Sequence, residues 1–264
     1  MAKIVIVMPY FDRQYQLNKT LSTIATSKHD DFRVVIVDDN SPNDIVLPEV
    51  GFPIEIMKIK GKNWTNCAPV WNYGFNRALS FNPDIIILQS AECYHVGDIL
   101  THAECDVTAG NYLAYGCFRI DKETTYKEHD IMELSTTHNF AVGAVEGNIG
   151  ECAWWNHPIY NRVPQYWCTA ISAGNMIMLN GVDERFAYGY AYEDGYFQHQ
   201  VENLRLEIEI TDYPFVVHQW HDHIYPEKLV GKVNPNVKIY EELMKDNNYK
   251  AQHLITPDLT WSGI

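Results

Sequence analysis

Short apolar runs alternate with helical patterns along the first hundred residues. Each run spans five or six residues and is rich in Ile, Val, Leu or Met, which is typical of strands buried on both faces of a sheet. Between the runs, apolar residues recur at helical spacing, and the predicted helices cover 12–27 and 69–79. The predicted strands cover 3–8, 33–37, 54–59 and 84–88. This order predicts an α/β fold with a mostly parallel central sheet flanked by helices.

The second half of the chain has a weaker pattern. Residues 121–167 are rich in turn formers and aromatic residues, and we expect a long excursion that serves as a lid or a substrate loop. The pattern beyond it predicts a strand over 169–179, a helix over 192–206, a strand over 215–220 and a last helix opened by Asn234-Pro235. No internal repeat or linker interrupts the sequence, so we expect one domain over 1–264.

Composition narrows the classes of partner. The 264 residues include 20 Lys and Arg and 34 Asp and Glu, which gives a formal net charge of −14. So acidic a chain is a poor electrostatic partner for nucleic acid or for an anionic membrane. No apolar stretch reaches the roughly 18 residues of a membrane-spanning helix. The six cysteines form no CxxC pair, so we expect a reduced, cytoplasmic protein whose oligomeric state the sequence does not indicate.

Several phosphate-binding and hydrolase motifs are absent. The first predicted strand runs into MPYFDRQ, which lacks the GxGxxG of dinucleotide-binding folds, and no GxxxxGK[ST] loop occurs. The nucleophile elbow GxSxG and the zinc motif HExxH are absent as well. An acidic sheet that binds phosphate without such glycine loops needs a divalent cation to offset the charge.

Acidic residues follow three of the predicted strands. Asp12 comes after the first strand, Asp38 and Asp39 end the second, and Glu92 follows the fourth. Ligands of parallel α/β sheets bind at the carboxyl ends of the strands, so we expect these side chains to meet at one edge. Alternatively, these acids merely terminate strands. That explanation is adequate for a single acidic residue but less so for acids after three strands.

The order and spacing of several short segments carry a family resemblance. In the first half they read IVIVMPYFDRQYQLNKTLSTI, VVIVDDNSP, NYGFNRAL and DIIILQSAE. Together they resemble the nucleotide-sugar half of family 2 glycosyltransferases of the GT-A fold. In the second half, GNMIMLNGVDERFAYGYAYEDGYF resembles the acceptor half, and HQWHDH is similar to the C-terminal histidine segment of some members. The resemblance covers most of residues 3–100 and 169–223.

This resemblance implies an enzyme that moves a sugar from a nucleoside diphosphate to an acceptor hydroxyl, with inversion and with the help of a metal. It divides the expected domain into a nucleotide-sugar-binding half at 1–100, an acceptor-binding half at 101–230 and a C-terminal helical tail at 231–264. Two other functions stay open. One is a nucleotidyltransferase of similar fold, and the other is an inactive module that binds sugar nucleotides or glycans.

The expected metal site departs from the family pattern. Where members carry Asp-x-Asp, this chain reads Gln89-Ser90-Ala91-Glu92, with a single carboxylate. The resemblance implies that Glu92 and His218 hold Mn²⁺ or Mg²⁺, and that His221 either joins them or contacts the diphosphate. A zinc site that also uses His223, or buried histidines without a ligand, are the alternatives.

The resemblance also implies a set of donor-binding residues. Asp38 or Asp39, with Asp38 slightly preferred, would accept a hydrogen bond from the base, which favours uracil and therefore a UDP-sugar. Either residue could instead cap a turn. Tyr10 could stack on the base, and Arg13 could reach a phosphate or pair with a nearby acid. The expected donor-binding residues are Pro9, Tyr10, Arg13, Asp38, Asp39 and Asn72.

Two adjacent acids stand in the first turn of the helix predicted over 192–206. The helix dipole stabilises Glu193 and Asp194 there, which by itself is a sufficient structural reason for them. Neighbouring helix residues point about 100° apart, so we expect one to face the acceptor and the other to brace the structure. By the resemblance, Asp194 is the general base. Trp154, Trp155 and Trp167 either stack on sugar or cover the core.

Overall fold

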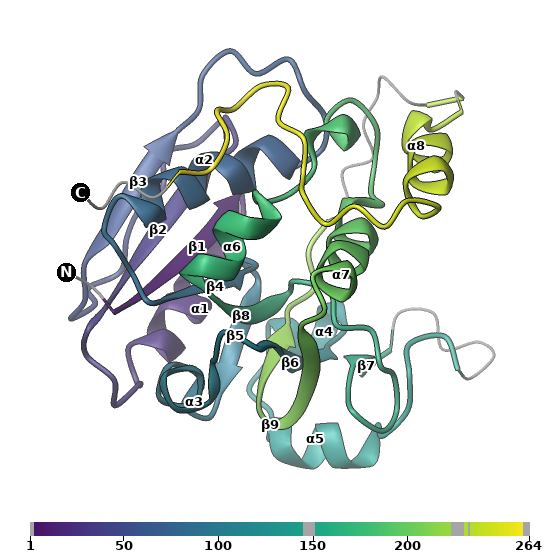
Figure 1. Cartoon of the computed structure of the whole chain (residues 1–264). Helices are drawn as coiled ribbons and strands as arrows, with labels where there is room; N and C mark the ends of the chain where they lie inside the picture. The colour runs from purple at the N-terminus through teal and green to yellow at the C-terminus, as the bar shows by residue number, and fades with distance from the viewer. Residues whose placement is uncertain (1–2, 145–150, 223–229, 232, 261–264) are drawn as a thin grey trace.

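The computed structural model describes residues 3–144, 151–222, 230–231 and 233–260. The described strands form one sheet in the order β3-β2-β1-β4-β8-β6-β9-β5, and β7 pairs with β6 off this path. Figure 1 shows the twisted sheet with helices packed against it. No helix in this part of the chain combines the length and the apolar character that crossing a bilayer would need.

The first half of the chain forms the parallel part of the sheet. Its elements are β1 Ile4–Tyr10, α1 Gln14–Ile24, β2 Phe32–Asp38, β3 Ile54–Lys58, α2 Ala68–Leu79 and β4 Ile85–Gln89. β1 lies between β2 and β4, and β2 pairs with β3, all in parallel. Side chains alternate along β1, so that Val5 and Val7 join the core cluster of α2 while Ile4 and Ile6 join that of α1. The elements predicted for this half are confirmed.

The chain beyond β4 adds strands of both directions. These strands are β5 Cys93–Val96, β6 Asn111–Arg119, β7 Ala153–Asn156, β8 Cys168–Ser172 and β9 Glu207–His218. β8 is antiparallel to both β4 and β6, whereas β9 is parallel to β6 and antiparallel to β5. The sheet is therefore mixed, and the expectation of a mostly parallel sheet holds for the first half alone. Parallel neighbours need a crossover helix between them, and the second half does not supply one for each strand pair.

Residues 169–179 are not a single strand, contrary to the prediction. β8 ends at Ser172, whose hydroxyl accepts a hydrogen bond from the backbone N–H of Asn175 at 3.2 Å and caps helix α6, Ala173–Leu179. The segment TAISAGNMIML is apolar along most of its length, so its pattern fits a strand and a buried helix equally well. The serine N-cap is the signal that separates the two.

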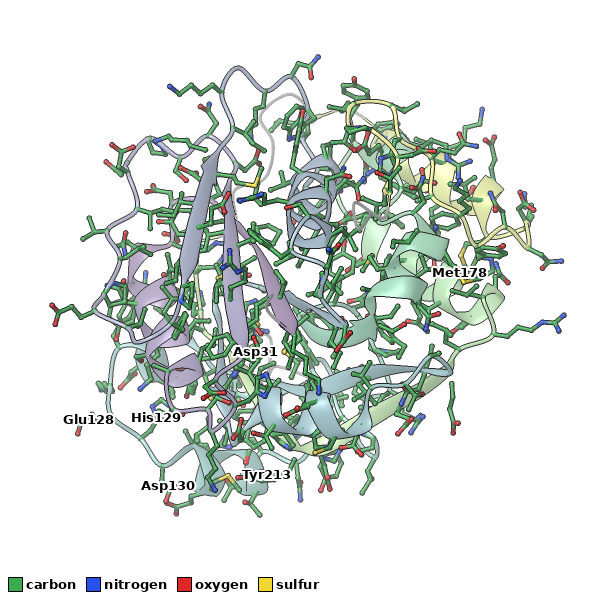
Figure 2. The ribbon with its side chains drawn as sticks, turned by 60° about the vertical axis from the view of Figure 1, so that its left-hand side comes forward. Asp31, Glu128, His129, Asp130, Met178 and Tyr213 are labelled. Atoms are coloured by element: carbon green, nitrogen blue, oxygen red, sulfur yellow. The ribbon has the colours of Figure 1, made fainter. Side chains whose placement is uncertain are left out.

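The 121–167 excursion contains more regular structure than the sequence predicts. It holds α4 Lys122–Thr125, α5 Ile131–Thr137 and β7, and an unpredicted helix, α3 Ile99–Asp106, precedes it. Between α4 and α5, Glu128, His129 and Asp130 lie at the molecular surface (Figure 2). The Asp130 carboxylate accepts hydrogen bonds from the first backbone N–H groups of α5, which explains where that helix begins.

Three further helices follow in the C-terminal part of the chain. They are η1 Glu184–Phe186, α7 Glu193–Asn203 and α8 Pro235–Leu243, and the helices predicted around 192–206 and after Asn234 are confirmed. The described chain beyond α8 consists of turns and irregular structure, and the buried Glu184 carboxylate fixes it. That carboxylate accepts hydrogen bonds from the backbone N–H groups of Leu254, Ile255 and Thr256 at 2.7, 2.6 and 3.1 Å.

Candidate active site

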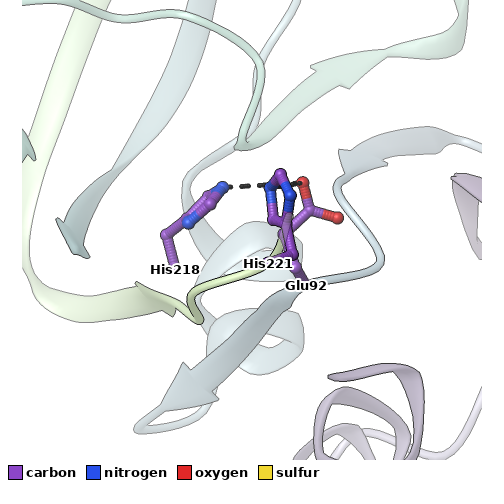
Figure 3. Close-up of side chains that lie close together, drawn as sticks. All are labelled: Glu92, His218 and His221. Carbon is purple, nitrogen blue, oxygen red and sulfur yellow. Dashed lines mark ion pairs between the residues drawn. The ribbon is translucent and has the colours of Figure 1, made fainter. Parts of the chain in front are cut away.

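Three side chains from separate parts of the chain meet beyond the carboxyl ends of β4 and β9. Glu92 lies in the turn between β4 and β5, His218 is the last residue of β9, and His221 follows it. Their potential ligand atoms lie within 4.8 Å of one another, and all three side chains are buried (Figure 3). The register of β5 and β9 sets Cys93 opposite His218, which makes Glu92 and His218 neighbours. His223 lies outside the described residues.

The backbone around this cluster is held in place by its own contacts. Gln219 donates two hydrogen bonds to the Glu92 carbonyl, from its backbone nitrogen at 3.1 Å and from Nε2 at 2.9 Å. The Trp155 ring packs edge-on against His218, with 4.3 Å between the ring centroids. These contacts therefore hold the backbone at Glu92 and the ring of His218 in place.

Glu92 and His221 have the protonation states of metal ligands, an ionised carboxylate and a neutral imidazole. Burial opposes ionisation of Glu92, but the Arg13 guanidinium and the two histidines outweigh it and hold the pKa of that carboxyl well below its usual range. Burial lowers the pKa of His221 to about 4, so its imidazole is neutral near pH 7. One carboxylate and two imidazoles fit a divalent cation of the transition series, such as Mn²⁺, better than they fit Mg²⁺, which prefers oxygen ligands.

The Gln89 amide, which comes three residues before Glu92, bonds to β5. Its Nε2 donates to the carbonyl of Cys93 at 2.5 Å, and its Oε1 lies 3.1 Å from Nε2 of His95. Both partners belong to β5. The Gln89 amide therefore has a structural role at the base of the turn, and Glu92 is the carboxylate that this segment contributes.

Arg13 pairs with the cluster. It is the N-cap residue of α1, and its Nη1 lies 2.7 Å from Oε1 of Glu92. Of the two possibilities that the sequence left open, the structure shows the pairing with a nearby acid.

The two aspartates at the end of β2 have different surroundings. Oδ1 of Asp38 accepts a hydrogen bond from the backbone N–H of Ser41 at 2.8 Å, which caps the turn that follows the strand. The Asp39 carboxylate instead lies 2.6 Å from Nζ of Lys62 and accepts from Nε1 of Trp64 at 3.2 Å. Burial raises the pKa of Asp39, and the Lys62 ammonium opposes that rise. Asp39 is the more accessible of the two carboxylates.

The other expected donor-binding residues lie at different depths. Pro9 is partly exposed at the end of β1, whereas Tyr10 is 4% exposed and packs in the core cluster of α1. Asn72 is fully buried on α2, where its amide donates to the Val182 carbonyl and to Glu184 and its oxygen accepts from the backbone N–H of Val182. Asn72 thus joins α2 to the turn before η1.

Glu193 and Asp194 have different surroundings. The Glu193 carboxylate accepts hydrogen bonds from Nδ2 of Asn66 at 2.5 Å and from the hydroxyl of Tyr166 at 3.2 Å. Asp194 is only partly buried and accepts from the backbone N–H of Gly195 at 2.7 Å. Burial, and then the neighbouring charge of Glu193, raise the pKa of Asp194 to about 7. Asp194 can therefore exchange a proton near neutral pH, while Glu193 is braced by its partners.

Adjacent aromatic residues connect the two carboxylate centres. Tyr166 contacts Glu193, and its chain neighbour Trp167 stacks on Trp155 with 5.3 Å between the ring centroids. Trp155 in turn packs against His218. A continuous chain of contacts therefore runs from the acidic pair at the start of α7 to the histidines after β9.

Several side chains of this site could not be identified from the sequence. They sit in irregular segments, and their contacts come from the fold rather than from spacing along the chain. These side chains are Lys62, Trp64, Asn66 and Tyr166. Trp154 belongs to the core instead, because its ring packs edge-on against Phe118 and is 4% exposed.

Similarity to known proteins is found at the level of structure. No family model and no curated protein sequence matches this chain. The structure of S. aureus TarS 1–349 in complex with UDP-GlcNAc is similar over 92% of this chain and 64% of the TarS chain, with a TM-score of 0.55 and 12% identity. The chain has the GT-A fold. The fold expected from the sequence resemblance is confirmed.

A second structure gives the same result for the GT-A fold. TarS 1–349 without a named ligand is similar over 82% of this chain and 60% of its own, with a TM-score of 0.54 and 11% identity. At this identity the likeness is one of fold. The chain matches about 60% of the length of TarS 1–349.

Proposed function

We propose that this chain is a glycosyltransferase that moves a sugar from a nucleoside diphosphate to an acceptor hydroxyl. The observation that carries the proposal is the connection of two centres on a GT-A fold. One is the buried cluster of Glu92, His218 and His221, and the other is Asp194 with its pKa near 7. TarS, which shares the fold, has been solved in complex with UDP-GlcNAc, and this supports a sugar nucleotide as the donor.

The donor would lie along the carboxyl ends of β1, β2 and β4. Glu92, His218 and His221 would hold a divalent cation, with Mn²⁺ favoured over Mg²⁺. When bound, such a cation supplies positive charge to the diphosphate leaving group. Asp39 would accept a hydrogen bond from the base, and because a carboxylate only accepts, a base with an imide N–H such as uracil fits it. A UDP-sugar is therefore the favoured donor.

The acceptor would be activated by Asp194. Its carboxylate takes the proton of the acceptor hydroxyl, and the freed oxygen forms a bond to the anomeric carbon. The bond from that carbon to the diphosphate oxygen breaks in the same step, and attack from the opposite side inverts the configuration. Glu193, held by Asn66 and Tyr166, braces the first turn of α7 while this happens.

Donor hydrolysis in the absence of acceptor tests the proposal. We expect one member of a panel of UDP- and GDP-sugars to release UDP or GDP slowly in the presence of Mn²⁺. Release of UMP or GMP would show cleavage within the diphosphate and would replace this function with nucleotidyl transfer. Tight binding of a sugar nucleotide without any release would identify a binding module instead.

The base is tested with a matched pair of variants. Asp194→Asn should abolish release of the nucleoside diphosphate while UDP binding stays close to that of the wild type. Asp246→Asn changes an exposed aspartate after α8 and should leave the rate unchanged. Full activity of Asp194→Asn would show that another group takes the proton.

A further inference from the structure

Among the described residues, one oxygen of Glu92 faces a guanidinium and two imidazoles. Nη1 of Arg13 lies 2.7 Å from Oε1 of Glu92, and Nε2 of His218 and of His221 lie 3.5 and 3.6 Å from the same oxygen. Oε1 is thus the carboxylate atom that faces both imidazoles (Figure 3). The atom best placed to bind a cation together with the histidines is already bound by a guanidinium.

Arg13 already offsets the charge of Glu92. The guanidinium carries one positive charge and lies 2.7 Å from an oxygen of the single carboxylate in the cluster. A divalent cation that enters this cluster must compete with Arg13 for Oε1 and must also lie close to a fixed positive charge. Both effects weaken cation binding to the protein alone, because the Glu92 side chain is buried and water screens these charges poorly.

We propose that Arg13 couples the binding of the cation to the binding of the diphosphate. In the free protein Arg13 neutralises Glu92 and keeps the affinity for the cation low. A diphosphate brings the negative charge that the cluster lacks and offers phosphate oxygens to the guanidinium, which favours such bidentate partners. Arg13 then turns to the phosphate, Oε1 becomes available to the cation, and the two ligands bind as a pair. This inference rests on the proposed function, because it takes a nucleoside diphosphate as the ligand.

Thermodynamic reciprocity makes the proposal quantitative. If UDP raises the affinity for Mn²⁺ by some factor, Mn²⁺ must raise the affinity for UDP by the same factor. Coupling between two sites is typically about 5- to 150-fold. A variant that removes the guanidinium should bind Mn²⁺ more tightly when alone and should lose much of the coupling.

Titration with Mn²⁺, followed by the electron paramagnetic resonance of the free ion, tests this without any turnover. For the wild type we expect UDP to tighten Mn²⁺ binding at least about tenfold. For Arg13→Gln we expect Mn²⁺ binding without UDP to tighten about tenfold, and the effect of UDP to shrink to less than about threefold. Arg13→Lys, which keeps the charge, should retain most of the coupling.

A matched control removes a nearby charge that does not touch Glu92. Arg119 lies opposite His218 in the register of β6 and β9, and its guanidinium lies over the Trp155 ring. Arg119→Gln should bind Mn²⁺ as the wild type does, and thermal unfolding of each variant checks that the fold is intact. The proposal is overturned if Arg13→Gln binds Mn²⁺ no more tightly than the wild type, or if Mn²⁺ fails to bind in every state.

The outcomes separate this inference from the proposed function. Donor hydrolysis with unchanged Mn²⁺ affinity in Arg13→Gln would reject the coupling and leave the glycosyltransferase intact. Tighter Mn²⁺ binding by Arg13→Gln, in a protein that turns over no sugar nucleotide, would reject the enzyme and leave Arg13 as the counter-ion of the cluster.

Discussion

The Tyr166 hydroxyl donates a hydrogen bond to the Glu193 carboxylate across 3.2 Å. Tyr166 packs in the core cluster of α2, whereas its chain neighbour Trp167 packs against the core cluster of α1. The segment just before β8 therefore contacts Glu193 through Tyr166. Through Trp167 it contacts Trp155, whose ring packs against His218. The Tyr166 contact fixes the position of the first turn of α7 relative to the sheet.

Removal of the Tyr166 hydroxyl should slow the reaction without weakening the donor complex. A hydrogen bond of this kind contributes about 1 kcal/mol, so we expect Tyr166→Phe to lower kcat roughly fivefold with little change in KM for the donor. Tyr112→Phe is the matched control, because its hydroxyl donates to the Pro164 carbonyl at 3.5 Å in the core. Steady-state kinetics measures both, and an equal loss of kcat in the two variants would contradict the prediction.

The rate should rise with pH through neutrality. Burial and the charge of Glu193 raise the pKa of Asp194 to about 7, so at pH 6 most of the base is protonated and inactive. We expect kcat to fall about tenfold per unit of pH below this pKa and to level off above it. The pH dependence of donor hydrolysis measures this fall in kcat.

Variants of α7 can test why the pH–rate profile falls near pH 7. The falling part of the profile is called its acidic limb. Glu193→Gln removes one charge that raises the pKa of Asp194, so the limb should move to lower pH even if the maximal rate falls. Glu202→Gln changes an exposed glutamate of α7 and should leave the limb in place. A limb that stays near pH 7 in Glu193→Gln would mean that burial alone sets the pKa.

The parallel half of the fold could be predicted because its strands are buried on both faces. A run such as Ile85–Gln89 has few polar residues, and helical patterns separate most of these runs. The second half could not be predicted as well. β8 and α6 share one apolar stretch, and β6 is buried along almost its whole length and shows no alternation. In both cases the period of the pattern is too short or too uniform to separate strand from helix.

The candidate site shows the same division. Glu92 and His218 could be brought together in advance, because Glu92 follows one predicted strand, His218 lies in another, and the family resemblance orders them. Lys62 and Trp64 could not, because they reach Asp39 from an irregular segment. The partner of Arg13 stayed open as well, since a long cationic side chain can reach a phosphate or an acid and the sequence does not fix its direction.

Loss of the Glu184 charge should loosen the C-terminal segment. One carboxylate oxygen accepts three backbone N–H groups of residues 254–256, and the other accepts from Asn72. In Glu184→Gln an amide NH₂ faces N–H donors, so we expect the free energy of unfolding to fall by about 2–4 kcal/mol. Urea unfolding measures this, and proteolysis should cut first near residues 250–259. Glu241→Gln, on the exposed side of α8, should behave as the wild type does.

The two aspartates at the end of β2 should separate into a ligand residue and a turn residue. Asp39→Asn replaces an acceptor oxygen with a donor NH₂, so an imide N–H of the base loses its partner. We expect UDP binding to weaken about tenfold, in line with the loss of a charge-assisted hydrogen bond, with little change in stability. Isothermal titration with UDP measures the affinity.

Asp38→Ala should show the opposite pattern. Its side chain is 1% exposed and accepts from the backbone N–H of Ser41, so truncation leaves a buried donor without its partner. We expect the free energy of unfolding to fall by about 1–3 kcal/mol, while UDP affinity stays within about threefold of the wild type. Because the fold places Asp38 beneath the turn and Asp39 beside Lys62, the two measurements should move independently. A larger loss of UDP affinity in Asp38→Ala than in Asp39→Asn would assign the base to Asp38.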